Sequence, residues 1–354
     1  MRKIILTGII LAGLIRLSGF LAASSSGTEI GEKAVETLAK NLIIPWDMLF
    51  LDSGEILITE RPGSLVRAAP DGRILERTKL DGVYHSGEGG LHGIAAHPAF
   101  SANSLLYLYY TFSGQEGTFN RVTRYIYDEN GLTEEKVILD NIPGGRIHNG
   151  GRIAFGPDGY LYVTAGDAGE ADSAQDKDSL AGKILRITDE GGIPPDNPFD
   201  NEVYSYGHRN PQGMTWDKDG RLWATEHGPR ARDELNMVVR GGNYGWPRIR
   251  GDSEEEGMIA PVINSGVSDT WAPAAAVYYE EKIFFAGLRG SAVYEYDTLS
   301  GELREHLKDA CGRIRAVDIR GGYLYFTTSN RDGRGRVRKG DDRLLRIDIK
   351  LLAE

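Results

Sequence analysis

A short pattern recurs six times along this chain and constrains its fold more than any other feature. Each copy has a β-rich run, a polar turn that often contains Asp-Gly, and a second β-rich run that ends in small or polar residues. The copies are Ile44–Glu60, Gly93–Phe112, Arg152–Asp167, Gly213–His227, Ala275–Gly287 and Ile314–Ser329. The turn glycines of the first and last copies, Gly54 and Gly322, are 268 residues apart over five intervals. The resulting period of about 54 residues is near the range of propeller blades.

We therefore predict an all-β protein, a six-bladed β-propeller with four-stranded antiparallel blades. Further β-rich runs between the copies would supply outer strands, namely Leu65–Ala68, Val122–Tyr127, Lys183–Ile187 and Ala292–Tyr296. The run Arg343–Ile349 has no partner of its own at its end of the chain, so it could close the ring beside an early strand. A pair of β-sandwiches or a chain of small β domains fits six copies of one pattern less well.

Few segments depart from this β pattern. Helical patterns are limited to Gly31–Ala39 and Ser173–Leu180. The stretches Gly166–Asp200 and Gly228–Thr270 are polar and irregular, and we expect them to form long loops. In a propeller such insertions can gather on one face and build a functional site.

The N-terminus has the pattern of a secretory signal, with a basic M-R-K start, an apolar stretch from Ile4 to Ile15 and small residues around Ala23. The segment Ile4–Ala23 is also just long enough for a membrane anchor. We expect residues 1–23 to be a signal peptide or N-terminal anchor, residues 24–32 a linker, and residues 33–354 the propeller domain. The protein would be exported, periplasmic or extracellular, with a membrane tether as the alternative.

The composition restricts the kinds of partner and crosslink that the chain can have. The formal net charge of −10 argues against sequence-independent nucleic-acid binding, which needs a basic face. The single cysteine, Cys311, excludes an intramolecular disulfide.

The stretch I-H-N-G-G-R-I-A-F places His148 beside two glycines, directly before a predicted strand. Gly150 and Gly151 would leave open space for a ligand to approach the imidazole. Asp167, at the far end of the same hairpin, is the nearest carboxylate that could fix the histidine tautomer. A lone histidine is more often structural, and a turn-capping role for Asp167 is about as common.

Two further stretches concentrate arginine. The sequence Y-G-H-R-N-P-Q-G brings Arg209 and Asn210 together before a predicted inner strand, where they would offer donors to an oxygen-rich ligand or form an ordinary polar turn. Arg313 and Arg315 share one face of a strand, so an anion between them would relieve their repulsion. Arg289 could add a third cation, although solvated arginines on an edge strand are common.

Possible cation and substrate contacts follow. Carboxylates, carbonyl oxygens and a Gly-Pro corner, as in E-H-G-P-R-A-R-D-E, suit Ca²⁺, although Glu234 could equally pair with a nearby arginine. The loop G-E-G-G-L-H-G-I-A-A-H-P would place Glu88 at the channel mouth, where it could bind a polyol. The roles of His92 and His97 stay open, and we interpret His97 as part of a turn.

Several of these motifs, in the same order, resemble the soluble PQQ-dependent glucose dehydrogenase family and more closely its aldose sugar dehydrogenase branch. The resemblance covers nearly the whole chain after the N-terminal segment. It is carried by G-E-G-G-L-H-G-I-A-A-H-P-A-F, H-N-G-G-R, Y-G-H-R-N-P-Q-G, E-H-G-P-R-A-R-D-E-L-N, N-Y-G-W-P and G-R-I-R. It implies a six-bladed propeller that holds pyrroloquinoline quinone (PQQ) and Ca²⁺ and passes electrons from an aldose sugar to an external acceptor.

The resemblance also implies a role for each matching residue. His148 would take the proton from the anomeric hydroxyl as hydride passes to the quinone, and Asp167 would hold His148. Arg209 and Asn210 would contact the quinone oxygens, while Arg289, Arg313 and Arg315 would clamp the cofactor carboxylates. One Ca²⁺ would bind the backbone oxygens of Gly228 and Pro229, and a second would use Glu234 and the carbonyl of Tyr244. Glu88 and Trp271 would contact the sugar.

This chain departs from the family pattern at four positions. Glu88 stands where glutamine is usual, Arg289 replaces a lysine, Ile147 replaces a polar residue and His92 replaces a leucine. These changes put the sugar preference in doubt. Two other functions compete with the dehydrogenase hypothesis, a calcium-dependent propeller lactonase or hydrolase and a non-catalytic secreted binding propeller. A hydrolase would need no arginine clamp for a tricarboxylate. Against a binding module stands the presence together of His148, Arg209, Asn210, Arg313 and Arg315.

Overall fold

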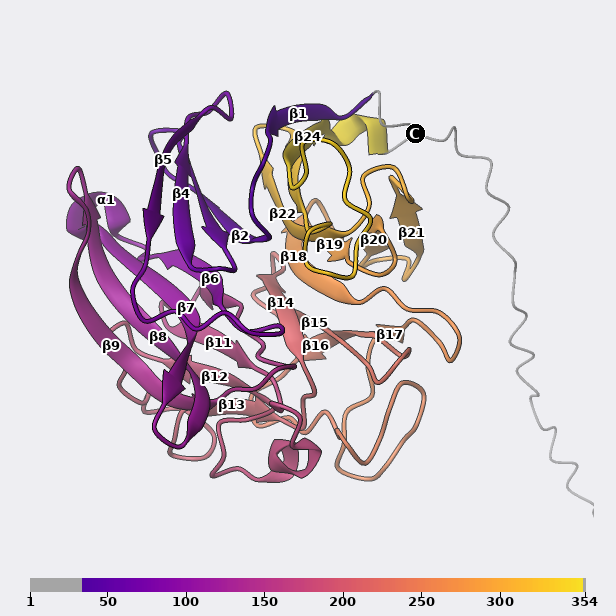
Figure 1. The fold of residues 1–354 in the computed structure, drawn as a ribbon. Helices are drawn as coiled ribbons and strands as arrows, with labels where there is room; N and C mark the ends of the chain where they lie inside the picture. The colour runs from indigo at the N-terminus through magenta and orange to yellow at the C-terminus, as the bar shows by residue number, and fades with distance from the viewer. Residues whose placement is uncertain (1–33, 353–354) are drawn as a thin grey trace, which may run out of the picture.

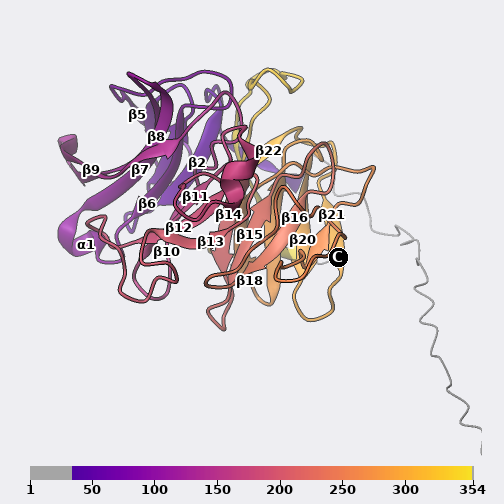
Figure 2. The same ribbon diagram turned by 90° about the horizontal axis from the view of Figure 1, so that it is seen from below.

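The computed structural model describes residues 34–352, in which six four-stranded antiparallel sheets surround a central axis (Figures 1 and 2). The six-bladed propeller predicted from the repeats is confirmed. The expected signal peptide or anchor at 1–23 and the linker at 24–32 lie outside the described residues. Among the described residues, no helix is long and apolar enough to cross a membrane.

The first three blades follow one another along the chain. Blade 1 consists of β2 (Pro45–Phe50), β3 (Ile56–Glu60), β4 (Ser64–Ala68) and β5 (Ile74–Lys79). Blade 2 consists of β6 (Leu91–Ala96), β7 (Leu105–Gly114), β8 (Gly117–Asp128) and β9 (Gly131–Pro143). Blade 3 consists of β10 (Ile153–Phe155), β11 (Leu161–Ala165), β12 (Lys183–Ile187) and β13 (Val203–Tyr206).

The last three blades complete the ring. Blade 4 consists of β14 (Pro211–Trp216), β15 (Leu222–Glu226), β16 (Glu234–Val238) and β17 (Ile263–Asn264). Blade 5 consists of β18 (Pro273–Tyr279), β19 (Lys282–Gly287), β20 (Ala292–Asp297) and β21 (Leu303–His306). Blade 6 consists of β22 (Ile314–Arg320), β23 (Tyr323–Thr328), β24 (Leu344–Asp348) and, from the other end of the chain, β1 (Glu36–Ala39).

Each copy of the sequence pattern forms the two inner strands of one blade. The turn between them needs a residue in the left-handed region, and Gly54, Gly159 and Gly220 occupy it with φ of 84°, 80° and 76°. Glycine adopts this conformation without the clash that a Cβ would cause, which explains why the period is so legible in the sequence.

The ring closes through strands from the two ends of the chain. β1 pairs antiparallel with β24, with Glu36 opposite Arg346, and Arg346 Nε donates a 2.7 Å hydrogen bond to Glu36 Oε2. Figure 1 shows the indigo β1 beside the yellow β24. The predicted closure by Arg343–Ile349 beside an early strand is confirmed. The helical interpretation of Gly31–Ala39 is wrong, because its described end is this closing strand.

The apolar core consists of six clusters, each between two neighbouring blades. The third cluster joins blade 6 to blade 1 and contains Leu344, Ile58 and Val66, all fully buried. Each such side chain contributes about 1.5–3 kcal/mol on burial. The blades therefore pack face to face through apolar side chains. The polar residues at the strand ends near the axis line a central cavity.

Regular structure outside the blades is short. It comprises α1 (Phe100–Asn103), η2 (Ala171–Gln175) and η3 (Ile349–Leu352). The helical pattern at Ser173–Leu180 corresponds only in part to η2. Both expected long loops are also partly wrong, because Gly166–Asp200 contains β12 of blade 3 and Gly228–Thr270 contributes β16 and β17 to blade 4.

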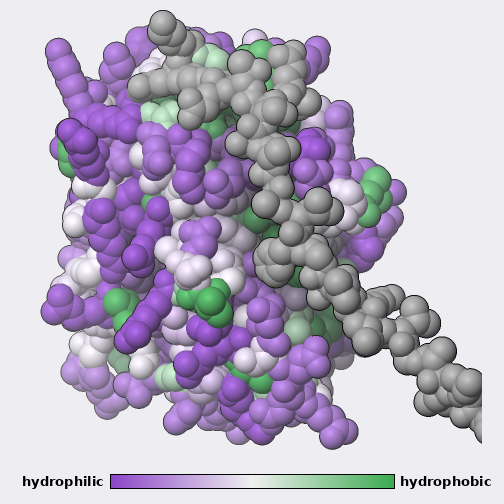
Figure 3. All heavy atoms as spheres, turned by 90° about the vertical axis from the view of Figure 1, so that its right-hand side faces the viewer, coloured by the Kyte–Doolittle hydropathy of each residue, from purple (hydrophilic) through white to green (hydrophobic). Residues whose placement is uncertain are grey.

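One face of the outer surface is mostly hydrophilic (Figure 3). On the face in Figure 3, apolar side chains form small groups separated by polar ones. Single exposed apolar residues such as Leu299 are normal for soluble surfaces. The candidate functional residues are therefore clustered at the centre of the ring.

Candidate active site

A central cavity of about 470 Å³ is lined by residues from all six blades. Its wall includes Trp46 of β2, His92 of β6, Gln212 of β14 and Arg315 of β22, which are inner-strand residues of four blades. A volume of this size suits a small-molecule ligand rather than a macromolecule.

The cavity wall carries an excess of positive charge. Its cationic residues are Arg61, Arg230, Arg289, Arg313, Arg315 and Arg334. Its carboxylates are Glu88, Asp233 and Asp332. Six arginines face three carboxylates inside a chain whose overall formal charge is −10, so this concentration favours an anionic ligand.

His148 and Asp167 form a close pair beside the cavity. His148 Nδ1 lies 2.6 Å from Asp167 Oδ1, and Trp246 Nε1 donates a 2.8 Å bond to the other carboxylate oxygen. Burial tends to raise the pKa of Asp167, but the hydrogen bond and charge of His148 outweigh it and hold that pKa below its usual range. An ionised Asp167 fixes the proton on Nδ1 and leaves Nε2 as the basic nitrogen.

The glycines after His148 serve packing rather than access. His148 itself is left-handed, with φ of 56°. A Cβ on Gly150 would lie 2.5 Å from the Thr164 carbonyl oxygen, and one on Gly151 would lie 2.6 Å from His92 Nδ1. The interpretation of the double glycine as an opening for ligand is therefore corrected, because neighbouring backbone and the His92 ring fill that space.

Arg209 and Asn210 connect the histidine to the next blade. The side-chain oxygen of Asn210 accepts a 3.0 Å bond from the Gly150 N–H, and Arg209 Nη1 donates to the carbonyl oxygens of His227 and Gly228. Neither residue lies on the wall of the large cavity, but each bonds to a residue that does. Arg209 Nε and Asn210 Nδ2 are buried without a protein partner among the described residues.

The other predicted arginines line the cavity, with different partners. Arg313 bonds through Nε and Nη2 to one oxygen of Asp332, at 2.9 and 2.7 Å. Arg315 Nη1 donates to Gln212 at 2.6 Å, while its Nε has no partner among the described residues. Burial lowers the pKa of Arg315 to about 9, and the charge of Arg61 acts in the same direction. Arg289 is exposed on the rim.

The four residues predicted to bind metal lie together. Gly228, Pro229, Glu234 and Tyr244 line one small cavity of about 10 Å³, which Arg209 also lines. Burial, and then the negative charge of Glu226, raise the pKa of Glu234 well above its usual range, so a cation there would stabilise its charged form. Among residues 34–352 no group of three or more His, Cys, Asp or Glu side chains is arranged to hold a metal. Any cation site here would depend on carbonyl oxygens.

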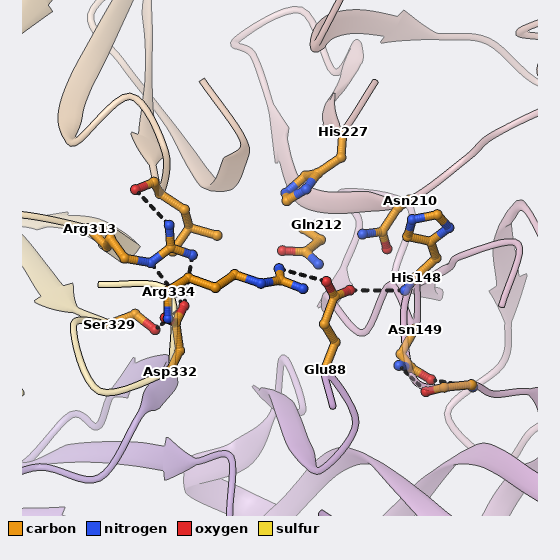
Figure 4. Close-up of polar contacts among 12 residues, drawn as sticks. Glu88, His148, Asn149, Asn210, Gln212, His227, Arg313, Ser329, Asp332 and Arg334 are labelled. Atoms are coloured by element: carbon orange, nitrogen blue, oxygen red, sulfur yellow. Dashed lines mark hydrogen bonds and ion pairs between the residues drawn. The ribbon is translucent and has the colours of Figure 1, made fainter. Parts of the chain in front are cut away.

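Glu88 joins two sides of the cavity (Figure 4). Its Oε2 accepts a 3.0 Å bond from the His148 backbone N–H, and its Oε1 lies 2.8 Å from Arg334 Nη1. Burial opposes ionisation of Glu88, but the His148 N–H, the charge interaction with His227 and the contact with Arg334 together outweigh it and lower its pKa to about 2. Glu88 is therefore a carboxylate at neutral pH.

Trp271 does not line the cavity. It is only 3% exposed and packs in the core against Phe285 and Tyr294, with ring centroids 5.5 Å away in both cases. Its neighbours Thr270 and Ala272 are on the cavity wall instead. The assignment of Trp271 as a sugar contact is corrected accordingly.

The sequence interpretation missed Arg61, His227, Asp332 and Arg334 on the cavity wall. A usable signal was present, because the second strands of the first, fourth and fifth units end directly before residues of the cavity wall. His227 is the last residue of its unit, and Arg61 directly follows the first unit in the way that Arg289 closely follows the fifth. Aligning the unit ends would have placed these residues around one centre.

The donor set fits an anionic ligand that bears carbonyl and carboxylate oxygens. Asn210 Nδ2 and Arg315 Nε are buried hydrogen-bond donors that have no acceptor among the described residues. An unsatisfied buried donor costs about 1–3 kcal/mol, so a ligand oxygen at either position would recover that energy. The arrangement is thus compatible with PQQ.

Comparison with known proteins decides the family. Residues 42–346 match the glucose/sorbosone dehydrogenase family. The chain belongs to this family. Over 338 residues it is 32% identical to an aldose sugar dehydrogenase of Escherichia coli, with 84% of this chain and 91% of the relative covered.

Other members of the family are similar as well. The chain is 31% identical over 284 residues to quinoprotein glucose dehydrogenase B of Acinetobacter calcoaceticus, covering 69% of this chain and 59% of that protein. Among solved structures, the PQQ-bound form of an aldose sugar dehydrogenase from Streptomyces coelicolor superimposes with a TM-score of 0.83 at 39% identity, covering 89% of this chain and 97% of that one. Membership of this family makes the chain an oxidoreductase.

Proposed function

We propose that this protein is a PQQ-dependent aldose dehydrogenase that oxidises the anomeric carbon of a sugar to the lactone. The observation that carries the proposal is the His148–Asp167 pair, 2.6 Å apart, next to a cavity lined by six arginines. The similarity to a PQQ-bound aldose sugar dehydrogenase supports the same cofactor. When bound, PQQ supplies the electrophilic carbon that accepts the hydride.

In this proposal His148 is the general base. Its Nδ1 is engaged by Asp167, so Nε2 is the nitrogen that takes the proton from the anomeric hydroxyl. The left-handed backbone of His148 is held by the bond from its N–H to Glu88. Glu88 would in addition accept hydrogen bonds from sugar hydroxyls, because an ionised carboxylate is a strong acceptor.

Positive groups would hold the cofactor. Arg209 and the free amide nitrogen of Asn210 would bind the quinone oxygens, where Arg209 stabilises developing negative charge. Arg289, Arg313 and Arg315 would bind the carboxylates. In each case the supporting observation is a guanidinium or amide on or next to the cavity wall.

Calcium would occupy the Gly228–Pro229 corner. A hard cation prefers oxygen ligands, and the carbonyl of Gly228 already faces the Arg209 guanidinium at 2.9 Å. Arg209 would therefore share this carbonyl with the ion. A second, structural Ca²⁺ would use Glu234 and the Tyr244 carbonyl.

The physiological setting follows from the same proposal. An external electron acceptor would reoxidise the cofactor, and the N-terminal pattern at 1–23 supports export from the cytoplasm.

The test is dye reduction by purified protein with a panel of aldoses, with and without PQQ and Ca²⁺. Activity that needs sugar, PQQ and Ca²⁺ together is expected. Absence of PQQ-dependent activity on every aldose would contradict the proposal, and sugar-lactone hydrolysis without PQQ would favour a hydrolase.

A further inference from the structure

Six arginines are buried among the described residues, and their partners divide them into two groups. Four of them form ion pairs with carboxylates, Arg152 with Asp47, Arg186 with Asp158, Arg313 with Asp332 and Arg343 with Asp341. The other two, Arg61 and Arg315, have no carboxylate within ion-pair distance among residues 34–352. Both of these line the central cavity.

Arg61 is held rigidly by its backbone. It directly follows β3, its N–H bonds to the Ile44 carbonyl at 3.0 Å, and its own carbonyl accepts a 2.9 Å bond from Leu91. A Cβ on Gly90 would lie 2.0 Å from that carbonyl, so the Gly87–Gly90 loop packs tightly over it. The side chain therefore projects into the cavity from a fixed position.

The guanidinium of Arg61 has few hydrogen-bond partners among the described residues. It is 5% exposed, and its one hydrogen bond to a described side chain is a long one of 3.4 Å from Nε to His85 Nε2. Its remaining N–H groups have no protein acceptor among the described residues. Burial lowers the pKa of Arg61, whereas the charges of Asp332 and Glu88 raise it without bonding to it.

A buried cation without a partner is costly, because its lost hydration is not replaced. In the four ion-paired arginines, a carboxylate of the protein offsets this cost. For Arg61 and Arg315, residues 34–352 supply no such carboxylate, and both arginines face a cavity where a ligand carboxylate would fill that role. Because a guanidinium offers a planar fork of donors, a carboxylate is the group that it binds best.

We propose that Arg61 binds a carboxylate of the ligand in the central cavity, acting with Arg315 from the opposite end of the chain. The inference rests on the proposed function, in which that ligand is PQQ. It adds blade 1 to an anion site that the sequence predicted only from blades 5 and 6. Closing the ring is what brings these blades together.

The experiment is a PQQ titration in the presence of Ca²⁺, followed by quenching of tryptophan fluorescence, on the full-length protein. Arg61→Met, which keeps the aliphatic length without the charge, should weaken PQQ affinity roughly 10- to 100-fold. Arg61→Lys keeps a point charge without the fork and should lie in between. Arg67→Met is the matched control, because Arg67 is on the same blade, pairs with Glu55 at 3.0 Å and lies outside the cavity.

Thermal unfolding without PQQ separates binding from a structural role. Because Arg61 is buried and has no carboxylate in ion-pair contact among residues 34–352, Arg61→Met should melt at or above the wild-type temperature without PQQ and gain less from added PQQ. A clearly lower melting temperature without PQQ, or wild-type PQQ affinity in Arg61→Met, would overturn the inference. If the wild-type protein itself shows no saturable PQQ binding, the proposed function fails and this inference fails with it.

Discussion

Two histidine–carboxylate pairs lie on neighbouring blades of this propeller and have nearly the same geometry. His148 Nδ1 is 2.6 Å from Asp167, and His208 Nδ1 is 2.8 Å from Glu226. The pairs differ at the second ring nitrogen. His208 Nε2 lies 2.9 Å from Ser205 Oγ, whereas His148 Nε2 has no hydrogen-bond partner among the described residues.

The surroundings of the two histidines also differ, because His208 is more deeply buried than His148. The His208 side chain is fully buried and stacks on Tyr244 with ring centroids 4.7 Å apart. The His148 side chain is 12% exposed and sits beside the cavity. A carboxylate partner is therefore not the mark of a catalytic histidine. What distinguishes His148 is that one ring nitrogen is held by Asp167 while the other has no protein partner among the described residues, as its proposed role as a base requires.

Removing the open histidine should have the largest effect on turnover. We expect His148→Ala to lower kcat by roughly 10²- to 10⁴-fold, because the proton acceptor is lost. PQQ affinity should stay near the wild-type value, since His148 is not among the cofactor-binding residues. Steady-state dye reduction and PQQ titration measure the two quantities. Wild-type turnover in this variant would remove His148 from the mechanism.

The carboxylate of the same pair should matter nearly as much. In Asp167→Asn the amide can present its N–H to Nδ1 and shift the ring proton to Nε2, the nitrogen that should accept the substrate proton. We expect kcat to fall by about 100-fold with a smaller change in KM. A loss confined to KM would show that Asp167 shapes the sugar site instead of orienting the base.

Removing His208, whose two ring nitrogens are both bonded, should mainly lower the stability of the protein. His208→Ala leaves Ser205 Oγ and Glu226 Oε2 without their buried histidine partner, while Glu226 Oε1 keeps the Arg209 N–H. We therefore expect the free energy of unfolding to fall by about 2–3 kcal/mol. Urea denaturation gives this value, and kcat per folded molecule should fall far less than in His148→Ala. If His208→Ala instead abolished turnover in a stably folded protein, the distinction between the two pairs would be lost.

Glu88 gives the smallest and most pH-dependent effect. The folded-state pKa of Glu88, about 2, lies below its ordinary value of 4.5. Its contribution to stability is therefore present above pH ~4.5 and is lost as the pH falls through about 2. Between pH ~5 and ~3 the wild type should lose about 2 kcal/mol relative to Glu88→Gln in urea unfolding. Parallel losses in both proteins would mean that Glu88 is not held ionised.

The repeats made the fold readable from the sequence. Four of the six units mark their turn with glycine in a left-handed position, as at Gly54, Gly159, Gly220 and Gly322, and so reveal the two inner strands of a blade. β1 was harder to recognise, because Glu36–Ala39 is only four residues long and becomes a strand through its pairing with β24. β16 and β17 were hidden for a similar reason, since polar insertions surround them.

The site was only partly readable. His148, Asp167 and Asn210 could be selected from local motifs. In the structure His148 bonds to Asp167, and Asn210 bonds to the nearby Gly150. Trp271 could not be placed, because an aromatic residue next to a cavity segment has the same sequence signature whether it faces the ligand or the core. Arg61 lacked any motif, and its role depends on what the fold leaves unpaired around it.

The most direct test of the central claim is the absorbance spectrum of bound PQQ in a single turnover. Wild-type protein loaded with PQQ and Ca²⁺ should reduce the quinone when an aldose is added without any electron acceptor. His208→Ala should do so at a comparable rate per folded molecule, and His148→Ala should bind PQQ but leave it oxidised. Rapid reduction of the quinone in His148→Ala would contradict the assignment of the open histidine as the base.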